Sequence, residues 1–181
     1  MDEEVFSGFF ADNFDDVWRF ARWRSPSSAE ADDVAAETFA VAWRRRADIP
    51  VGKEARLWLF GVARNVIANQ RREVERRGRL HLRLATTASV PDSYEPSGPS
   101  EHILWSALAA LAEADRELLL MRAWDELDVA EIAMILEIST ANVSSRLYKA
   151  RRRLTDEIVR RDPEWSGHVH GESPRRKEQW S

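Results

Sequence analysis

Apolar residues recur every three or four positions along most of this chain, and that spacing restricts it to helices that each bury one face. The first stripe consists of Phe6, Phe9, Phe10, Phe14, Val17, Trp18 and Ala21. A capping signal at Ser27 and Glu30 predicts a second helix that runs to about Arg46. A third is expected from about Glu54 to Arg77. Because glycine and proline are few (seven of each in 181 residues) and Val/Ile alternation is absent, we predict an all-α protein.

A change of composition divides the chain into two parts. Proline and glycine gather among Ser, Asp and Glu over residues 86–100, and no apolar periodicity continues there. We therefore predict two small helical domains, 1–84 and 101–161, joined by a flexible linker at 85–100. The polar segment 162–181 is expected to be a disordered tail.

Several classes of function are disfavoured by composition. The chain has no cysteine, which excludes disulfides, thiolate zinc sites and cysteine nucleophiles. Its four histidines lack catalytic or metal spacing apart from a His-x-His in the tail, and there is no phosphate-binding glycine loop. We expect no enzyme activity, no cofactor and no metal. The acidic N-terminus and the short longest apolar run, Leu57–Ala63, predict no membrane insertion and a cytoplasmic location.

Charge is arranged in blocks, although the net charge is only −4. Residues 56–83 hold eight arginines and two acids, and residues 139–161 hold seven basic and two acidic residues. The acidic block 1–33 precedes the first basic block, and the acidic block 91–137 precedes the second. Local clustering of Arg and Lys is typical of nucleic-acid binding, whereas the acidic blocks would repel phosphate and should face a basic protein partner. The alternative is that these blocks are only solvated helix faces.

Residues 128–154 have the pattern of a helix-turn-helix. Two inner stripes are separated by Ile138 in the turn and by Ser139, a good N-cap. The stripes consist of Val129, Ile132, Ala133 and Leu136, then Val143, Leu147, Ala150 and Leu154. The outward residues are Thr140, Ala141, Ser144, Ser145, Tyr148 and Lys149, followed by Arg151, Arg152 and Arg153. Short polar side chains let such a helix approach base edges while Lys and Arg contact phosphates, so we predict DNA binding over an ordinary basic hairpin.

The predicted third helix carries a second candidate surface. Four polar residues, spaced four, three and four, share a face away from its apolar stripe: Asn65, Asn69, Arg72 and Arg76. Asparagine amides can donate to and accept from base edges, and the arginines would contact phosphates. Periodicity alone leaves open whether the asparagines are merely solvated and whether Trp58 stacks on bases or packs in the core.

Three motifs in this order resemble the bacterial sigma-70 family of RNA polymerase initiation factors, most closely its small two-domain extracytoplasmic-function group. Ala31–Phe39 with Ala42 and Trp43 resembles region 2.2. Trp58–Asn65, followed by Asn69, Arg71 and Arg72, resembles regions 2.3 and 2.4. Glu131–Arg151 resembles region 4.2. The resemblance covers all but roughly the last twenty residues of the chain, and it depends on the three motifs occurring together in the right order with a linker between them.

The resemblance implies a sigma factor that binds core RNA polymerase, through its β′ clamp helices and β flap, and directs promoter recognition and opening. It implies polymerase-binding roles for Asp33 and Glu37. It implies −10 element contacts by Asn65, Asn69, Arg71, Arg72, Arg76 and Trp58. It implies −35 element contacts by Thr140, Ser144, Ser145, Tyr148, Lys149 and Arg151. The loop from Asp48 to Lys53 matches one that holds a flipped-out base, and many relatives have an anti-sigma factor as a further partner.

The chain departs from the family pattern at three positions. Ala36 replaces a common Gln, Glu137 replaces a common Gly in the bend, and Ser144 replaces a common basic residue. A helix-turn-helix regulator that does not bind polymerase is the alternative function. It would account for residues 100–161 but would leave the two earlier motifs unexplained.

Overall fold

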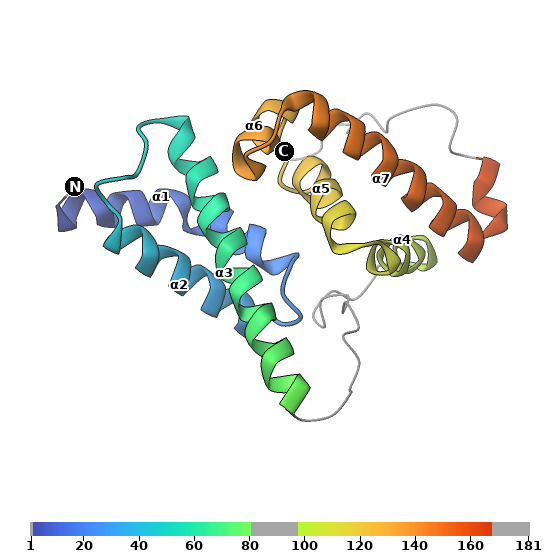
Figure 1. Cartoon of the computed structure of the whole chain (residues 1–181), viewed down its shortest axis with the longest axis horizontal. Coiled ribbons are helices and arrows are strands. Elements are labelled where there is room, and N and C mark those ends of the chain that lie inside the picture. Colours follow the sequence, from blue (N-terminus) through green and yellow to red (C-terminus); the bar gives the residue numbers. More distant parts are fainter. Residues whose placement is uncertain (1, 81–97, 168–181) are drawn as a thin grey trace, which may run out of the picture.

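The computed structural model describes residues 2–80 and 98–167, which form seven α-helices and one short 3₁₀ helix (Figure 1). In chain order they are α1 (Glu3–Arg22), α2 (Ser28–Arg44), α3 (Lys53–Leu80), α4 (Pro99–Ala110), α5 (Glu113–Ala123), α6 (Val129–Leu136), α7 (Thr140–Arg161) and η1 (Pro163–Gly167). The prediction of an all-α fold is confirmed. The predicted tail beyond residue 167 and most of the predicted linker lie outside the described residues. Within the described part, no helix combines the length and the apolar character needed to cross a bilayer.

Side-chain caps and one glycine set where the first three helices begin. The Asp2 carboxylate accepts a hydrogen bond from the Val5 N–H at 3.0 Å at the start of α1. The Ser27 hydroxyl accepts from the Glu30 N–H at 3.2 Å, which confirms the capping signal expected there. Gly52 precedes α3 with φ +72°, a conformation in which a residue with a Cβ is strained. These local features fix the helix starts before any long-range packing is considered.

The helix-turn-helix forms where the sequence predicts it. Asp128 and Glu131 make a reciprocal capping box at the start of α6, with both hydrogen bonds at 2.8 Å. Glu137 ends α6 in the left-handed region, at φ 54° and ψ 41°. Such a conformation costs a non-glycine residue about 1 kcal/mol. Ile138 then packs against the core, and the Ser139 hydroxyl caps α7 by accepting from the Asn142 N–H at 3.2 Å.

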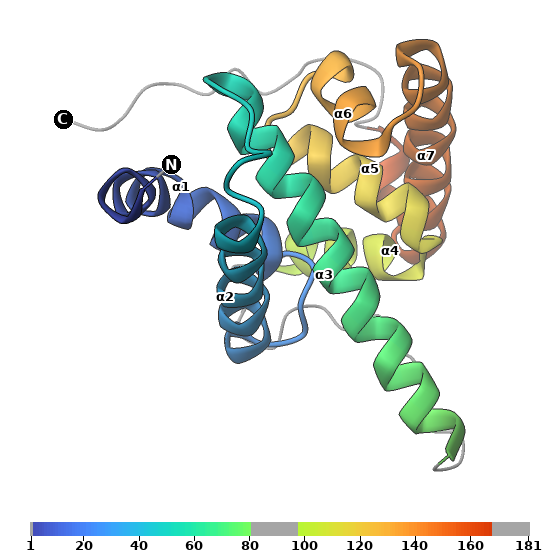
Figure 2. The ribbon, with the colours of Figure 1, turned by 60° about the vertical axis from the view of Figure 1, so that its left-hand side comes forward.

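The two halves of the chain share one hydrophobic core. In Figures 1 and 2, α3 lies between α1 and α2 on one side and α5 and α6 on the other. The core joins Leu59 and Ala63 of α3 to Leu118, Met121 and Ile132 of the second half. A second, smaller core is built mainly from α4, α5 and α7. The bundle formed by α1 to α3 therefore packs against helices of the second half, and the domain boundaries themselves remain a prediction.

Candidate nucleic-acid and polymerase interfaces

The polar face of α3 is accessible at all four positions that the sequence places on it. Asn65, Asn69, Arg72 and Arg76 are all exposed, whereas Val62 and Val66 are buried on the opposite face. An Arg72 guanidinium nitrogen donates to the Asn69 side-chain oxygen at 2.7 Å. This bond orients the amide so that its NH₂ group is directed to the other side, where it can donate to an acceptor. The face offers amides flanked by cations, the combination that suits base edges beside phosphates.

Two other residues expected at the −10 element are less accessible. Trp58 is half-buried against the shared core, and the Arg45 guanidinium lies 5.6 Å from the centre of its ring. Arg71 is half-buried, forms an ion pair with Glu113 of α5 and donates to the Arg24 carbonyl oxygen at 3.0 Å. Arg71 is thus occupied by protein contacts in this conformation, and α3 presents fewer free cations than its sequence suggests.

The outer face of α7 is exposed, as its periodicity predicts. The residues expected at the −35 element are all solvent-accessible: Thr140, Ser144, Ser145, Tyr148, Lys149 and Arg151. The inward stripe of Val143, Leu147 and Ala150 is buried. Tyr148 is 63% exposed, which is unusual for so large a ring and leaves it available to a partner. The capped N-terminus of α7 and this polar face together have the form of a major-groove reading helix.

The acidic face of α2 is also open. Asp33 and Glu37 are exposed on the side away from the buried residues Val34, Ala35 and Thr38. Glu37 pairs with Arg44 at 2.8 Å, a surface ion pair of little energetic weight that a partner can replace. The Trp18 indole donates to the neighbouring Asp32 carboxylate at 2.7 Å and fixes α2 against α1. This hydrogen bond therefore holds the helix that carries the acidic face in place relative to α1.

The loop between α2 and α3, residues 45–52, directly follows the helix that carries the acidic face. Val51 is 95% exposed at its tip, and Asp48 pairs with Arg45 at 3.1 Å. Gly52 provides the left-handed turn that returns the chain to α3. An apolar side chain held in solvent beside charged groups is suited to contact a base or another protein.

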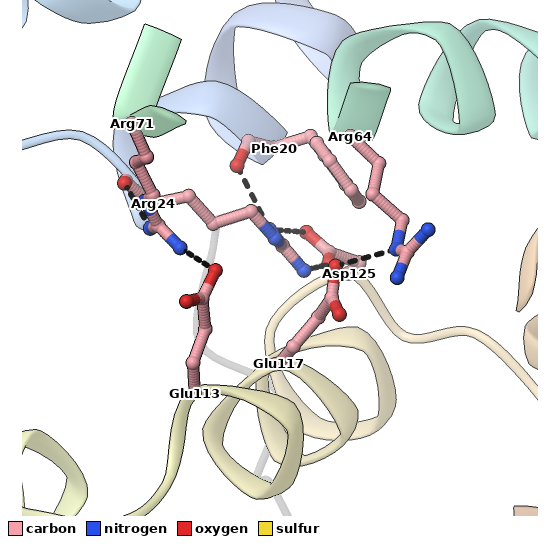
Figure 3. Close-up of polar contacts among 7 residues, drawn as sticks. All are labelled: Phe20, Arg24, Arg64, Arg71, Glu113, Glu117 and Asp125. Carbon is pink, nitrogen blue, oxygen red and sulfur yellow. Dashed lines mark hydrogen bonds and ion pairs between the residues drawn. The ribbon is translucent and has the colours of Figure 1, made fainter. Parts of the chain in front are cut away.

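Ion pairs link α3 and the turn after α1 to the second half of the chain (Figure 3). Arg64 of α3 donates to Glu117 of α5 at 2.9 Å, and Arg71 pairs with Glu113. The third pair joins Arg24, in the α1–α2 turn, to Asp125 after α5, with an N–O distance of 2.5 Å. Acidic residues of the second half thus neutralise basic residues of the first.

The pair between Arg24 and Asp125 is buried. Their side chains are 5% and 4% exposed, and the Arg24 guanidinium also lies 3.6 Å from the centre of the Phe20 ring. Burial raises the pKa of the Asp125 carboxyl, and the charge of Arg24 opposes that shift. Breaking a buried pair by removing one partner commonly costs about 3–5 kcal/mol, because the remaining charge stays without a counter-ion.

Periodicity within single helices did not predict these contacts. It found the exposed faces of α3 and α7, but it assigned no role to Arg24, Arg64 or Asp125. The sequence does contain one indication of these contacts, the opposite charges of blocks 56–83 and 91–137. Charge alone assigns the two blocks to a nucleic-acid surface and a partner surface. Part of the acidic block instead faces the basic helix of the same chain.

Comparison with known proteins agrees with the motifs and the fold. Family models of "Sigma-70 region 2" and "Sigma-70, region 4" match residues 9–77 and 101–154. The chain is 32% identical over 142 residues to the ECF RNA polymerase sigma factor SigL of Mycobacterium tuberculosis, covering 76% of this chain and 80% of SigL. It is 29% identical over 152 residues to the RNA polymerase sigma-E factor of Streptomyces coelicolor, covering 82% of each.

Solved structures show the same fold. The sigma factor RpoE from Bartonella quintana, in complex with the anti-sigma factor NepR, matches with a TM-score of 0.69 at 22% identity, over 88% of this chain and 99% of that one. CnrH, in complex with the cytosolic domain of CnrY, matches with a TM-score of 0.64 at 23% identity, over 89% and 91%. From the matched family models, the relatives and the helical fold together, this chain belongs to the extracytoplasmic-function group of the sigma-70 family of RNA polymerase sigma factors.

Proposed function

We propose that this sigma factor uses three separate exposed faces for polymerase binding and for the two promoter elements. The polar face of α3 would contact the −10 element, and the outer face of α7 the −35 element. The acidic face of α2 would contact core polymerase. The observation that carries this assignment is that all three faces are solvent-accessible and are each backed by a buried apolar stripe. The same geometry gives no support to a regulator that acts without polymerase, since such a protein needs neither the α2 nor the α3 surface.

At the −10 element, Asn65 and Asn69 would read base edges once the strands separate. Arg72 and Arg76 would neutralise phosphates beside them, and Arg71 would join them only after leaving Glu113. Trp58, being half-buried, would contact the DNA only with the part of its ring that solvent reaches. The loop at 48–53 would hold an extruded base, which offsets the few kcal/mol needed to unstack it.

At the −35 element, the first turns of α7 would lie in the major groove. Ser144 and Ser145 are short enough to let the helix backbone approach the bases, and Thr140 lies beside its capped N-terminus. Tyr148 would contact bases or sugars, while Lys149 and Arg151 would contact phosphates. Ser144 carries no charge, so we expect fewer phosphate contacts here than a basic residue at this position would make.

The polymerase contact would rest on Asp33 and Glu37, which need a basic surface on the β′ clamp helices. Because two structurally similar proteins were solved with an anti-sigma factor or the cytosolic domain of a second protein, we include an anti-sigma factor among the partners. A protein with these partners works in the cytoplasm.

Transcription with purified core enzyme tests the assignment at the −10 element. We expect Asn65→Ala and Asn69→Ala to reduce strand opening about tenfold or more, since one bidentate base contact is worth about 1–3 kcal/mol. Binding to core polymerase should change less than about twofold, because neither residue lies on the acidic face. Opening is measured by fluorescence of a base analogue in the −10 element, and polymerase binding by anisotropy.

The matched control is Asn13→Ala, which removes the same amide from α1, where it donates to the Phe9 carbonyl at 2.8 Å. This variant should keep normal opening. Equal losses of opening and of polymerase binding in the α3 variants would instead assign a structural role to the two asparagines. Absence of any stimulated transcript on a genomic promoter library would refute the assignment altogether.

A further inference from the structure

The turn after α1 inserts into the second half of the chain. Trp23 stacks on Trp105 of α4, with ring centres 5.2 Å apart and planes inclined by 11°. Trp124, at the end of α5, completes the group at 5.2 Å from Trp105 and 6.3 Å from Trp23. Trp23 thus packs against the smaller core, which is otherwise built from residues beyond position 100. A side chain of the first half is part of the hydrophobic structure of the second.

The next residue, Arg24, extends this insertion with polar contacts. Its guanidinium donates to both Asp125 carboxylate oxygens, at 2.5 and 3.5 Å, and to the Phe20 carbonyl at 2.8 Å (Figure 3). Arg71 of α3 donates to the Arg24 carbonyl and pairs with Glu113. Trp23 is therefore held by ring stacking. Arg24 is held by its ion pair with Asp125 and by the hydrogen bond from Arg71 to its backbone carbonyl.

We infer that Trp23 and Arg24 form a latch that holds the free sigma factor closed, and that this latch must release before both reading faces can occupy one promoter. This inference rests on the proposed function for its second half. Its first half, the closed state of the free protein, stands on the contacts alone.

The closed state is too compact to span a promoter. The two elements, which their names place about 25 base pairs apart, are separated by about 85 Å of duplex at ~3.4 Å per base pair. Val66 and Val143, which lie beside Asn65 and close to Ser145, belong to one hydrophobic core. A compact chain of this length has a radius of gyration of only about 16 Å. The reading faces must therefore move apart before both can contact one promoter.

The latch also has features of a contact that can be released. The Arg24 Nε is buried and has no hydrogen-bond partner among the described residues. Water would satisfy this donor if the turn moved away from Asp125. The cost of leaving the donor unsatisfied therefore offsets part of the attraction between Arg24 and Asp125 in the closed state. The accompanying pairs, Arg64 with Glu117 and Arg71 with Glu113, use cations of α3 that phosphates could attract instead. Promoter DNA and closure thus compete for some of the same residues.

Energy transfer between two dyes tests the closed state in the absence of polymerase. The natural chain has no cysteine, so Ala29→Cys in α2 and Ala110→Cys in α4, both exposed, provide unique labelling positions. We expect high transfer in the free wild-type chain. Asp125→Asn, which leaves Arg24 without a counter-ion, and Glu117→Arg, which opposes Arg64, should lower the transfer at least about twofold by shifting the population toward open molecules.

Two further variants separate opening from unfolding. Exchange of the charges in the double variant Arg64→Glu, Glu117→Arg should restore transfer, whereas a merely damaged fold would not recover. Glu157→Gln removes the same kind of charge from pairs within α7, with Arg160 and Arg161, and should leave transfer unchanged. Circular dichroism should show equal helix content in all of these proteins.

Titration with core polymerase and promoter DNA links the latch to function. Transfer in the wild-type chain should fall as the complex forms, and Asp125→Asn should need about tenfold less polymerase for half-maximal opening if about nine in ten free molecules are closed. Low transfer in the free wild-type chain, or transfer unchanged by both Asp125→Asn and Glu117→Arg, would overturn the latch. High transfer that the variants lower, but that polymerase and DNA never change, would support the closed state and overturn the proposed function instead.

Discussion

At the scale of single residues, Glu137 has a left-handed backbone conformation that is unusual for a residue with a side chain. It lies in the bend between α6 and α7 with positive φ, a conformation that glycine adopts more readily than other residues. We predict that Glu137→Gly stabilises the protein by about 0.5–1 kcal/mol, because glycine adopts the left-handed region without a Cβ clash. Thermal unfolding followed by circular dichroism measures the effect.

The control for this substitution is Glu157→Gly, in the right-handed helical part of α7. There glycine should destabilise by roughly 1 kcal/mol, because it loses more backbone freedom and no strain is relieved. A destabilised Glu137→Gly protein would mean that the Glu137 side chain makes a stabilising contact in the bend.

At the scale of helices, Asp16 links α1 to α3, because its carboxylate accepts a hydrogen bond from the Nε of Arg56 in α3 at 2.5 Å. Asp16 also pairs with Arg19 of its own helix. Burial, the largest single influence, acts to raise the pKa of Asp16, but Arg56 and Arg19 together hold it below its ordinary value of 3.8. A carboxyl with a lowered pKa stabilises the fold above that ordinary value and ceases to do so as the pH falls through its folded pKa. The link between α1 and α3 should therefore weaken in acid.

We predict that the wild-type chain loses more thermal stability than Asp16→Asn when the pH is lowered from about 5 to about 3, and that the variant is the less stable protein near neutral pH. Melting temperatures at several pH values check both statements. Asp15→Asn, which removes a neighbouring exposed carboxylate, should keep the wild-type acid dependence. If the melting temperatures of the wild type and of Asp16→Asn fell in parallel as the pH is lowered, the stabilising link between Asp16 and Arg56 would be contradicted.

At the scale of the whole molecule, the shared core makes the two halves one cooperative unit. Leu118, Met121 and Ile132 are packed in the same cluster as Leu59 and Ala63 of α3. Calorimetry of the free wild-type chain should therefore show a single transition, with equal calorimetric and van't Hoff enthalpies. Glu117→Arg, which places a second cation beside Arg64, should lower the midpoint of this transition, because it weakens the contact between the halves. Two transitions in the wild-type chain would show that the halves are not coupled.

Much of this architecture follows from local sequence because its causes are local. The three- and four-residue apolar spacing, the caps at Ser27 and Ser139 and the bend at Glu137 each involve neighbours along one helix or turn. The exposure of Asn65 and Ser145 follows for the same reason, since a helix that buries one stripe must present the opposite one.

Apolar spacing and local capping thus predict the first three helices, the helix-turn-helix and the face that each of these helices buries, and three motifs indicate the family to which the chain is similar. The packing of the two halves against each other, the burial of Arg24 against Asp125 and the protein contacts of Arg71 become visible only once the helices are assembled. The physical reason is that periodicity describes each helix relative to its own axis. Pairing between residues as distant in the chain as Arg24 and Asp125, which are 101 positions apart, depends on how the helices dock, which no single helix encodes.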